Sequence, residues 1–519
     1  MALSATSIGA DRVAKGSPRL QSRLFAVLAA ELIALAFIRL PYGLDFDAFA
    51  FSDIGSNFTI QHLLSQGQSP GLDFGYPYGL LPVLAGKIWF SLFGMVPIAY
   101  EASIVACGLV VVWALAQMAA SLQFRTFGLA LLFIGLGFAI QVSYPNLTHI
   151  MESALLALAL YSQSRANRSD ALAFTCAALF CKPSMSYVYG LVLVILVTMD
   201  LLRRRSPVSG FVRAFAPAVI TGTTLLVILA ALYGPASVFQ TLLPVQGLST
   251  YHGQNFGFFG GIGRSFWNPP NVPWIYYLFD FSGLWIASSI FLVVCGTMAW
   301  TRWYRKTAPT TLDARRDEIV WTCAILHLAF IFFFFGNRWS WICYSFILIL
   351  GVAAAADLSP INRRLALILC VLGLTSWIGR GWYIAKYWRE RSPSAMTAGL
   401  WAPPDETAEW QNVRALAHGH RAIILETKGD AALMFPEFAP PVALYLDPGL
   451  MPAMEIQRQV EQLSGASIVV VCISDNIAPQ SQGIPKATEI ENAMKSFDLV
   501  FAGKYFDVYR RRDAGVSVH

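Results

Sequence analysis

The residues with the clearest chemical potential are four aspartates within one 42-residue stretch, residues 41–82: Asp45, Asp47, Asp53 and Asp73. This stretch lies between the first strongly apolar segment of the chain and the next. A carboxylate at the surface of a bilayer can remove the proton of a hydroxyl group as a general base. Two carboxylates can also bind a divalent cation, which prefers oxygen ligands.

Each aspartate also has a purely structural interpretation. Asp53 precedes an expected helix over residues 54–64, and Asp is a favoured N-cap residue. Asp73 lies in the segment SPGLDFGYP, where Asp is an ordinary turn residue. Asp45 and Asp47 have the positions of solvated charges at a membrane interface.

Lys182 is the cation most suited to a functional role, because it interrupts an apolar run over residues 170–202. A charge inside a membrane segment is costly, and a functional role is the default hypothesis for it. Lys182 could pair with a phosphate group, or it could extend its ammonium toward lipid headgroups. Arg264, in an aromatic loop over residues 251–281, and Arg338 are further phosphate ligands by type, or arginines that contact headgroups.

Three more polar side chains stand near expected helix ends or in loops. His149 and Glu152 begin an apolar segment, where they could face a cavity or cap the helix end. His252 follows Tyr251 in the aromatic loop and could contact a sugar or a metal, although a single loop histidine is usually structural or exposed.

The elements that must position these residues are membrane helices. Only 13% of the 519 residues are charged, 56% are hydrophobic, and the mean hydropathy is +0.54. Apolar runs of about 17–22 residues recur, as expected for membrane spans. The basic residues form short clusters between these runs, which follows the positive-inside rule and excludes a nucleic-acid-binding surface.

The sequence predicts eleven spans, the first of them uncleaved. Lys182 and Pro183 divide the run 170–202 into a hairpin, because proline removes a backbone donor. The predicted spans are 24–40, 99–119, 127–143, 149–162, 170–181, 184–202, 214–233, 283–301, 319–336, 340–356 and 365–384.

Charge placement supports this count. With the N-terminus in the cytoplasm, every basic cluster is cytoplasmic only if the run 170–202 crosses the membrane an even number of times. The loop 41–98, the turns 144–149 and 337–339, the loop 235–282 and everything after 385 are then outside. Within the first loop, residues 79–95 predict an apolar helix lying along the membrane surface.

Residues 399–519 differ in composition from residues 1–398 and predict a small α/β domain outside the membrane. Buried strands are expected at 421–426 and 467–472, helices at 452–463 and 488–496, and a closing hairpin at 498–502 and 505–510.

The first predicted outer loop resembles that of the GT-C class of membrane glycosyltransferases, which use lipid-phosphate-linked sugars. In this class an acidic residue follows the first span, a helix ends in a Leu-x-x-Gly turn, and a Pro/Tyr-rich Asp-Phe segment leads into an apolar helix. The matching elements are Asp53, residues 64–67, Asp73-Phe74, Tyr76/Tyr78-Gly79 and residues 80–93. The interrupted apolar segment at Lys182-Pro183 and the small outer domain are also similar to such proteins.

The resemblance implies a mainly α, polytopic helical bundle with a small C-terminal α/β domain, in a bacterial inner membrane. It implies transfer of a sugar from a polyprenyl-phosphate donor to a glycan, lipid or protein acceptor, with Asp53 as the base and Asp73 assisting. A divalent cation at Asp53 and Asp73 is left open. Many relatives have a second acidic residue where this chain has Ile54, so Asp45 and Asp47 stay open as alternatives. The expected substrate-binding residues are Lys182, Arg338, Arg264, Asp47, His149, Glu152, Tyr78 and His252.

Two other function classes fit parts of the sequence. A transporter or flippase of a lipid-linked saccharide would also need intramembrane cations, and inverted repeats would favour it. A non-catalytic subunit for envelope assembly could use the acidic loop to bind a partner.

Overall fold

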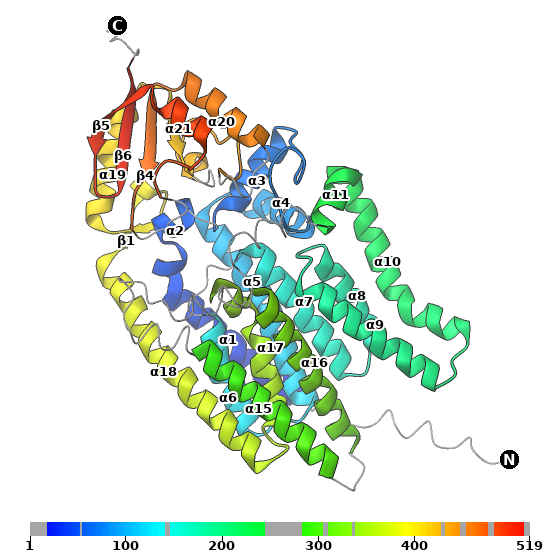
Figure 1. Ribbon diagram of the computed structural model, residues 1–519. Coiled ribbons are helices and arrows are strands. Elements are labelled where there is room, and N and C mark those ends of the chain that lie inside the picture. Colours follow the sequence, from blue (N-terminus) through cyan, green and yellow to red (C-terminus); the bar gives the residue numbers. More distant parts are fainter. Residues whose placement is uncertain are drawn as a thin grey trace, which may run out of the picture.

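The structure is a computed structural model that describes residues 18–51, 54–140, 146–243, 283–304, 310–334, 338–426, 431–446, 453–475 and 482–512. These residues form a long helical bundle with a small sheet-containing domain at one end (Figure 1).

Helices lie over all eleven predicted spans. Five of the described helices are long and apolar enough to cross a membrane by length and composition alone, namely α1, α5, α9, α10 and α15. Together with the small C-terminal sheet, they confirm the predicted polytopic helical bundle. The bounds are α1 (Pro18–Gly43), α5 (Pro97–Ser121), α6 (Thr126–Ile140), α7 (Leu147–Ser164), α8 (Arg168–Leu179), α9 (Met185–Arg203), α10 (Val208–Tyr233), α15 (Gly283–Tyr304), α16 (Thr311–Phe334), α17 (Arg338–Ala355) and α18 (Pro360–Glu390).

Small side chains let the central helices approach one another closely. Ala114 and Ala116 of α5 and Ala157 and Ala159 of α7 are fully buried at the centre of the bundle. In a membrane, helices associate through such close packing because lipid tails are as apolar as the side chains they would replace. Outer helices instead expose their apolar side chains, as α10 does with Val212 at 63% exposure.

The segment 170–202 is a hairpin, as predicted. Arg168 at the start of α8 lies 3.9 Å from a carboxylate oxygen of Asp200 near the end of α9. The backbone nitrogen of Arg125 also donates to Asp357 over 3.0 Å. The ends that carry basic clusters are therefore joined to one another at one end of the bundle.

The loops on the other side lie at the end of the bundle that carries the C-terminal domain (Figure 1). They contain α2 (Phe46–Ala50), α3 (Ser56–Ser65), α4 (Leu81–Phe93) and α11 (Pro235–Leu242). The helix α4 corresponds to the surface helix predicted over 79–95, and its Leu92 is 71% exposed. An apolar side chain this exposed suits a helix that rests on lipid.

The C-terminal domain contains a four-stranded sheet of order β3-β4-β6-β5, in which β3 and β4 are parallel and the other pairs antiparallel. All five residues of β4 are buried, which explains their continuous apolar run. The predicted boundary at 398/399 stays a prediction, and a two-stranded ribbon of β1 (Ser392–Pro393) and β2 (Trp401–Ala402) straddles it. The remaining elements are η3 (Ala395–Thr397), α19 (Pro404–Ala417), β3 (Ala422–Leu425), η4 (Ala431–Leu433), α20 (Ala453–Gly465), β4 (Ile468–Cys472), α21 (Thr488–Met494), β5 (Phe497–Ala502) and β6 (Phe506–Arg511).

Candidate active site

The break between α8 and α9 holds Lys182 against the first outer loop. The backbone nitrogens of Gly79 and Leu81 donate to the carbonyl oxygens of Cys181 and Phe180, over 2.9 Å and 2.8 Å. Gly79 is required for this approach, because a Cβ atom there would lie 2.1 Å from the Phe180 carbonyl oxygen. The broken helix and the loop therefore meet backbone to backbone.

The Lys182 side chain is buried, with 7% exposure. Its Nζ lies 3.1 Å from His149 Nε2, and it lies 5.8 Å and 5.7 Å from the ring centres of Tyr78 and Tyr344. An ammonium group has no acceptor, so His149 Nε2 accepts this hydrogen bond. Its interior position makes the alternative, extension toward lipid headgroups, wrong.

Glu152 is the carboxylate beside this lysine. It is fully buried, accepts a hydrogen bond from the Ser186 backbone nitrogen over 3.2 Å and another from the Tyr344 hydroxyl, and feels the charge of Lys182. We call Lys182, His149, Glu152, Tyr78 and Tyr344 the lysine cluster.

The lysine cluster excludes the capping alternative for His149 and Glu152. The N-cap of α7 is Asn146, whose side chain accepts from the Thr148 backbone nitrogen over 3.0 Å. Tyr344 was missed by sequence reasoning, and its only signal is the pair Tyr344-Ser345 inside an apolar run.

Asp73 is a turn residue that also touches the C-terminal domain. Its Oδ2 accepts from the Ser69 backbone nitrogen over 2.8 Å, which confirms the turn interpretation. Arg458 of α20 donates to the Asp73 carbonyl oxygen over 3.0 Å and to the Gln68 side chain over 2.7 Å. The sequence gives no sign of this contact across 385 residues.

Asp45 and Asp47 are buried, with 2% and 0% exposure, so the expectation of solvated charges is wrong. Asp45 caps α2 by accepting from the backbone nitrogen of Asp47 over 3.0 Å, and it forms an ion pair with Arg391. Asp47 accepts from the Ser474 hydroxyl over 3.0 Å.

Four of the other expected site residues have side chains that the structure does not describe. Asp53, Arg264 and His252 lie outside the described residues, as does the side chain of Arg338, which begins α17. The N-cap of α3 is Gly55, and the alternative in which Asp53 caps that helix stays a prediction.

Of the two expected cation ligands, Asp53 and Asp73, the structure describes only Asp73. No group of three or more His, Cys, Asp or Glu residues in the described part of the chain could hold a metal ion. Asp73 also lies 4.0 Å from the guanidinium of Arg458, which competes with a cation for its carboxylate. The cation at Asp53 and Asp73 stays a prediction.

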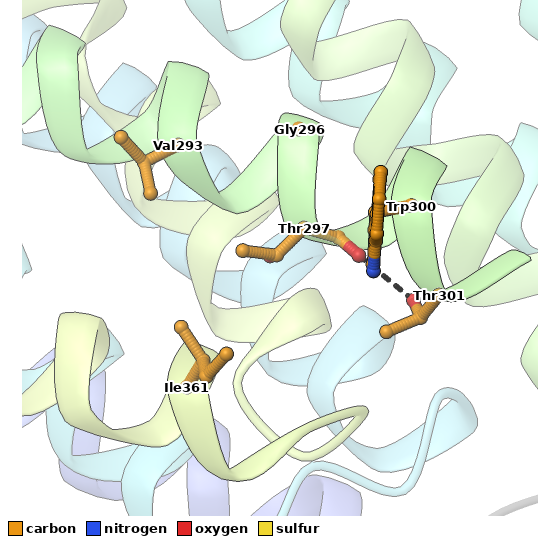
Figure 2. A pocket seen from close by; sticks show the side chains of 6 residues that line it. All are labelled: Val293, Gly296, Thr297, Trp300, Thr301 and Ile361. Atoms are coloured by element: carbon orange, nitrogen blue, oxygen red, sulfur yellow. Dashed lines mark hydrogen bonds between the residues drawn. The ribbon is translucent and has the colours of Figure 1, made fainter. Parts of the chain in front are cut away.

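An apolar groove of about 320 Å³ lies between α15 and α18 (Figure 2). The helix α18 has 31 residues and ends at the C-terminal domain, so its first turn lies about 46 Å from that domain at 1.5 Å per residue. The groove is therefore at the opposite end of the bundle from the lysine cluster, and its lining offers no ionisable group. It is lined by Val293, Gly296, Thr297, Trp300, Thr301 and Ile361.

The arrangement defines a class of fold, a polytopic helical membrane protein with a small C-terminal domain. The chain is similar to the crystal structure of ArnT from Cupriavidus metallidurans bound to undecaprenyl phosphate, with a TM-score of 0.51 and 13% sequence identity. The match covers 92% of this chain and 97% of that chain. No protein-family model and no curated protein matches the chain. The likeness confirms the GT-C-like fold predicted from the first outer loop.

Proposed function

We propose that the protein is a membrane glycosyltransferase that moves a sugar from a polyprenyl-phosphate donor to an acceptor outside the cytoplasm. One observation carries the proposal: over 92% of its length the chain has the fold of a protein whose structure holds undecaprenyl phosphate. The buried ammonium of Lys182, at the junction of the bundle and the outer loop, is a group that can bind a lipid phosphate.

In the proposed reaction an acceptor hydroxyl oxygen attacks the anomeric carbon of the sugar, and the bond from that carbon to the phosphate oxygen breaks. Asp53 takes the hydroxyl proton as general base. Direct displacement inverts the anomeric carbon. The departing polyprenyl phosphate gains negative charge, which a prearranged cation stabilises in a site with little water.

Lys182 supplies this cation in the proposal. Glu152 and the faces of Tyr78 and Tyr344 hold the ammonium group, because a carboxylate and aromatic rings both attract it. His149 orients it from 3.1 Å. The charge is therefore in place before the phosphate arrives.

Four further residues have proposed roles. Arg338, Arg264 and His252 remain proposed contacts to the phosphate or the sugar, and Asp73 assists by fixing the turn of the outer loop. Asp47 has no role as a substrate ligand in this proposal, because it is fully buried against the C-terminal domain.

The test is release of polyprenyl phosphate from a polyprenyl-phosphate sugar by the protein in lipid vesicles, with envelope material as the acceptor. Asp53→Asn should abolish release and leave binding of polyprenyl phosphate intact, because only the base is lost. The matched control is Asp498→Asn, a surface aspartate that pairs with Arg512 and is 59% exposed. Full activity of Asp53→Asn would refute the assignment of the base.

The same assay separates the other two function classes. A flippase would move the labelled donor across the vesicle membrane with its bond from sugar to phosphate intact. A non-catalytic assembly subunit would neither move nor cleave the donor. Cleavage that depends on the protein supports the transferase.

A further inference from the structure

The C-terminal domain is attached to the acidic outer loop through buried carboxyl groups. Asp47 of α2 and Glu406 of α19 are both fully buried and lie in contact through their carboxyl groups. Arg391 and Ser474 complete the group, because Arg391 pairs with Asp45 and Ser474 donates to Asp47. We call Asp45, Asp47, Glu406, Arg391 and Ser474 the carboxyl cluster.

The hydrogen bonds of the cluster are incomplete without one more proton. Among the described residues, neither oxygen of Glu406 nor Oδ1 of Asp47 has a donor. A buried acceptor without a donor is destabilising, and two facing carboxylates repel each other. A single proton held between Asp47 and Glu406 removes both penalties, since a protonated carboxyl group donates to a carboxylate.

The net charge of the carboxyl cluster also favours one bound proton. Three carboxyl groups face one guanidinium, so the cluster would carry two net negative charges if all of them were ionised. One proton reduces this to a single negative charge. Three other titratable groups lie near the cluster, and none adds a positive charge: the phenol of Tyr387, whose ring centre is 4.5 Å from the Arg391 guanidinium, the thiol of Cys472, and the carboxyl of Glu426, which follows β3.

The helix held by this cluster is packed tightly on the C-terminal domain. The ring of Phe46 lies 5.4 Å from the Trp410 ring and 6.1 Å from the rings of Phe435 and Phe506. Just before this helix, Trp401 donates its backbone N–H to the carbonyl oxygen of Leu44 over 2.7 Å. The carboxyl cluster is therefore at the centre of the contact between the outer loop and the domain.

We propose that Glu406 is a positioning residue which, by sharing a proton with Asp47, holds α2 and the acidic outer loop against the C-terminal domain. Only one part of the inference rests on the proposed function, namely that the attached loop takes part in sugar transfer. The attachment itself is a property of the fold and can be measured without a substrate.

The direction of the pH dependence follows from the environment of Glu406. Burial, and then the negative charge of Asp47, raises the pKa of Glu406 well above its ordinary value of 4.5. The attached state therefore binds a proton that the detached state releases at neutral pH. Attachment is strongest at low pH and weakens as the pH rises through the neutral and alkaline range, by up to about tenfold per unit.

The experiment is hydrogen–deuterium exchange on the full chain in lipid nanodiscs between pH 6 and 9.5, with rates corrected for the intrinsic effect of pH. The readout is the protection of the backbone amides of α2, Phe46–Ala50. In the wild type, protection should fall by up to about tenfold per pH unit. In Glu406→Gln it should stay high and change less than about twofold over the range, because a carboxamide donates to Asp47 without a titrating proton.

Two further variants keep the test decisive. Asp47→Asn removes the second cause of the raised pKa of Glu406 and places an amide donor beside it, so it should weaken the pH dependence. Glu461→Gln changes an exposed glutamate of α20 and should reproduce the wild-type profile. A wild-type protection that does not change with pH would overturn the proposal, and so would a Glu406→Gln profile that follows the wild type.

The transfer assay then links the attachment to the reaction. Glu406→Gln should extend activity to higher pH than the wild type while leaving the rate at neutral pH within about threefold, because a structural amide restores the hydrogen bond. If exchange shows the pH dependence and no variant has any transferase activity, the attachment stands and the proposed function fails.

Discussion

Lys182→Met tests whether the lysine cluster is a desolvated ion pair that also serves the substrate. The substitution removes the charge, keeps an unbranched side chain, and leaves Glu152 fully buried without its positive neighbour. Removal of one partner from a buried pair costs about 3–5 kcal/mol. The free energy of unfolding should therefore fall by about this amount, unless Glu152 takes up a proton and recovers part of the loss.

The double variant Lys182→Met/Glu152→Gln separates the structural role from the functional one. It removes both charges, and Gln can still accept the hydrogen bond from the Tyr344 hydroxyl. Its unfolding free energy should return to within about 1 kcal/mol of the wild type, because replacing a buried pair is often neutral. Binding of polyprenyl phosphate should stay lost, since the cation is absent.

The assays are denaturant-induced unfolding in detergent and binding of polyprenyl phosphate to vesicles that contain the protein. Lys386→Met is the matched control. Its ion pair with Glu390 is exposed and spans 3.7 Å, so its loss should change stability by less than about 1 kcal/mol. Two results would refute the reasoning: wild-type stability of Lys182→Met, or wild-type lipid binding by the double variant.

Three shorter predictions follow from other contacts. Gly79→Ala places a Cβ atom 2.1 Å from the Phe180 carbonyl oxygen and should lower the unfolding free energy by about 1–3 kcal/mol, whereas Gly296→Ala, with open space around it, should not. Asp73→Asn should reduce transfer by no more than about tenfold, since Asn also supports turns; complete loss would show instead that Asp73 is a catalytic residue. Burial raises the pKa of Glu455 from 4.5 to about 8. Between pH 4.5 and 8 the folded chain therefore keeps a proton on Glu455 that the unfolded chain releases. As the pH rises across that window, the free energy of unfolding should fall by about 1 kcal/mol per pH unit. Thermal unfolding at a series of pH values checks this, and Glu455→Gln should reduce the slope by about this amount.

The order of the helices could be predicted from the sequence because membrane insertion is governed by local properties. A run of apolar residues must form a helix in lipid, where every backbone group needs an internal partner. The interruption at Lys182-Pro183 also has a local cause, since proline cannot continue the hydrogen-bond ladder. The helices α8 and α9 therefore begin and end within a few residues of the predicted hairpin.

The site was predicted only in part. The sequence singled out Lys182, His149 and Glu152 one by one, because polar residues are rare in apolar runs. It could not show that they meet, or that Tyr344, 192 residues after Glu152 in the chain, joins them. It also gave the wrong environment for Asp45 and Asp47, whose burial depends on Arg391 and Glu406, more than 340 residues away.

The sequence by itself determined that this protein is a helical membrane bundle with a small terminal domain, and it determined where the chain turns. Hydrophobicity, proline and the placement of charge act over one span at a time, so they can be read in order along the chain. Only the tertiary structure decided which polar groups share a proton, a charge or a hydrogen bond. These interactions fall off within a few ångströms, and only the packing of distant segments brings their partners that close.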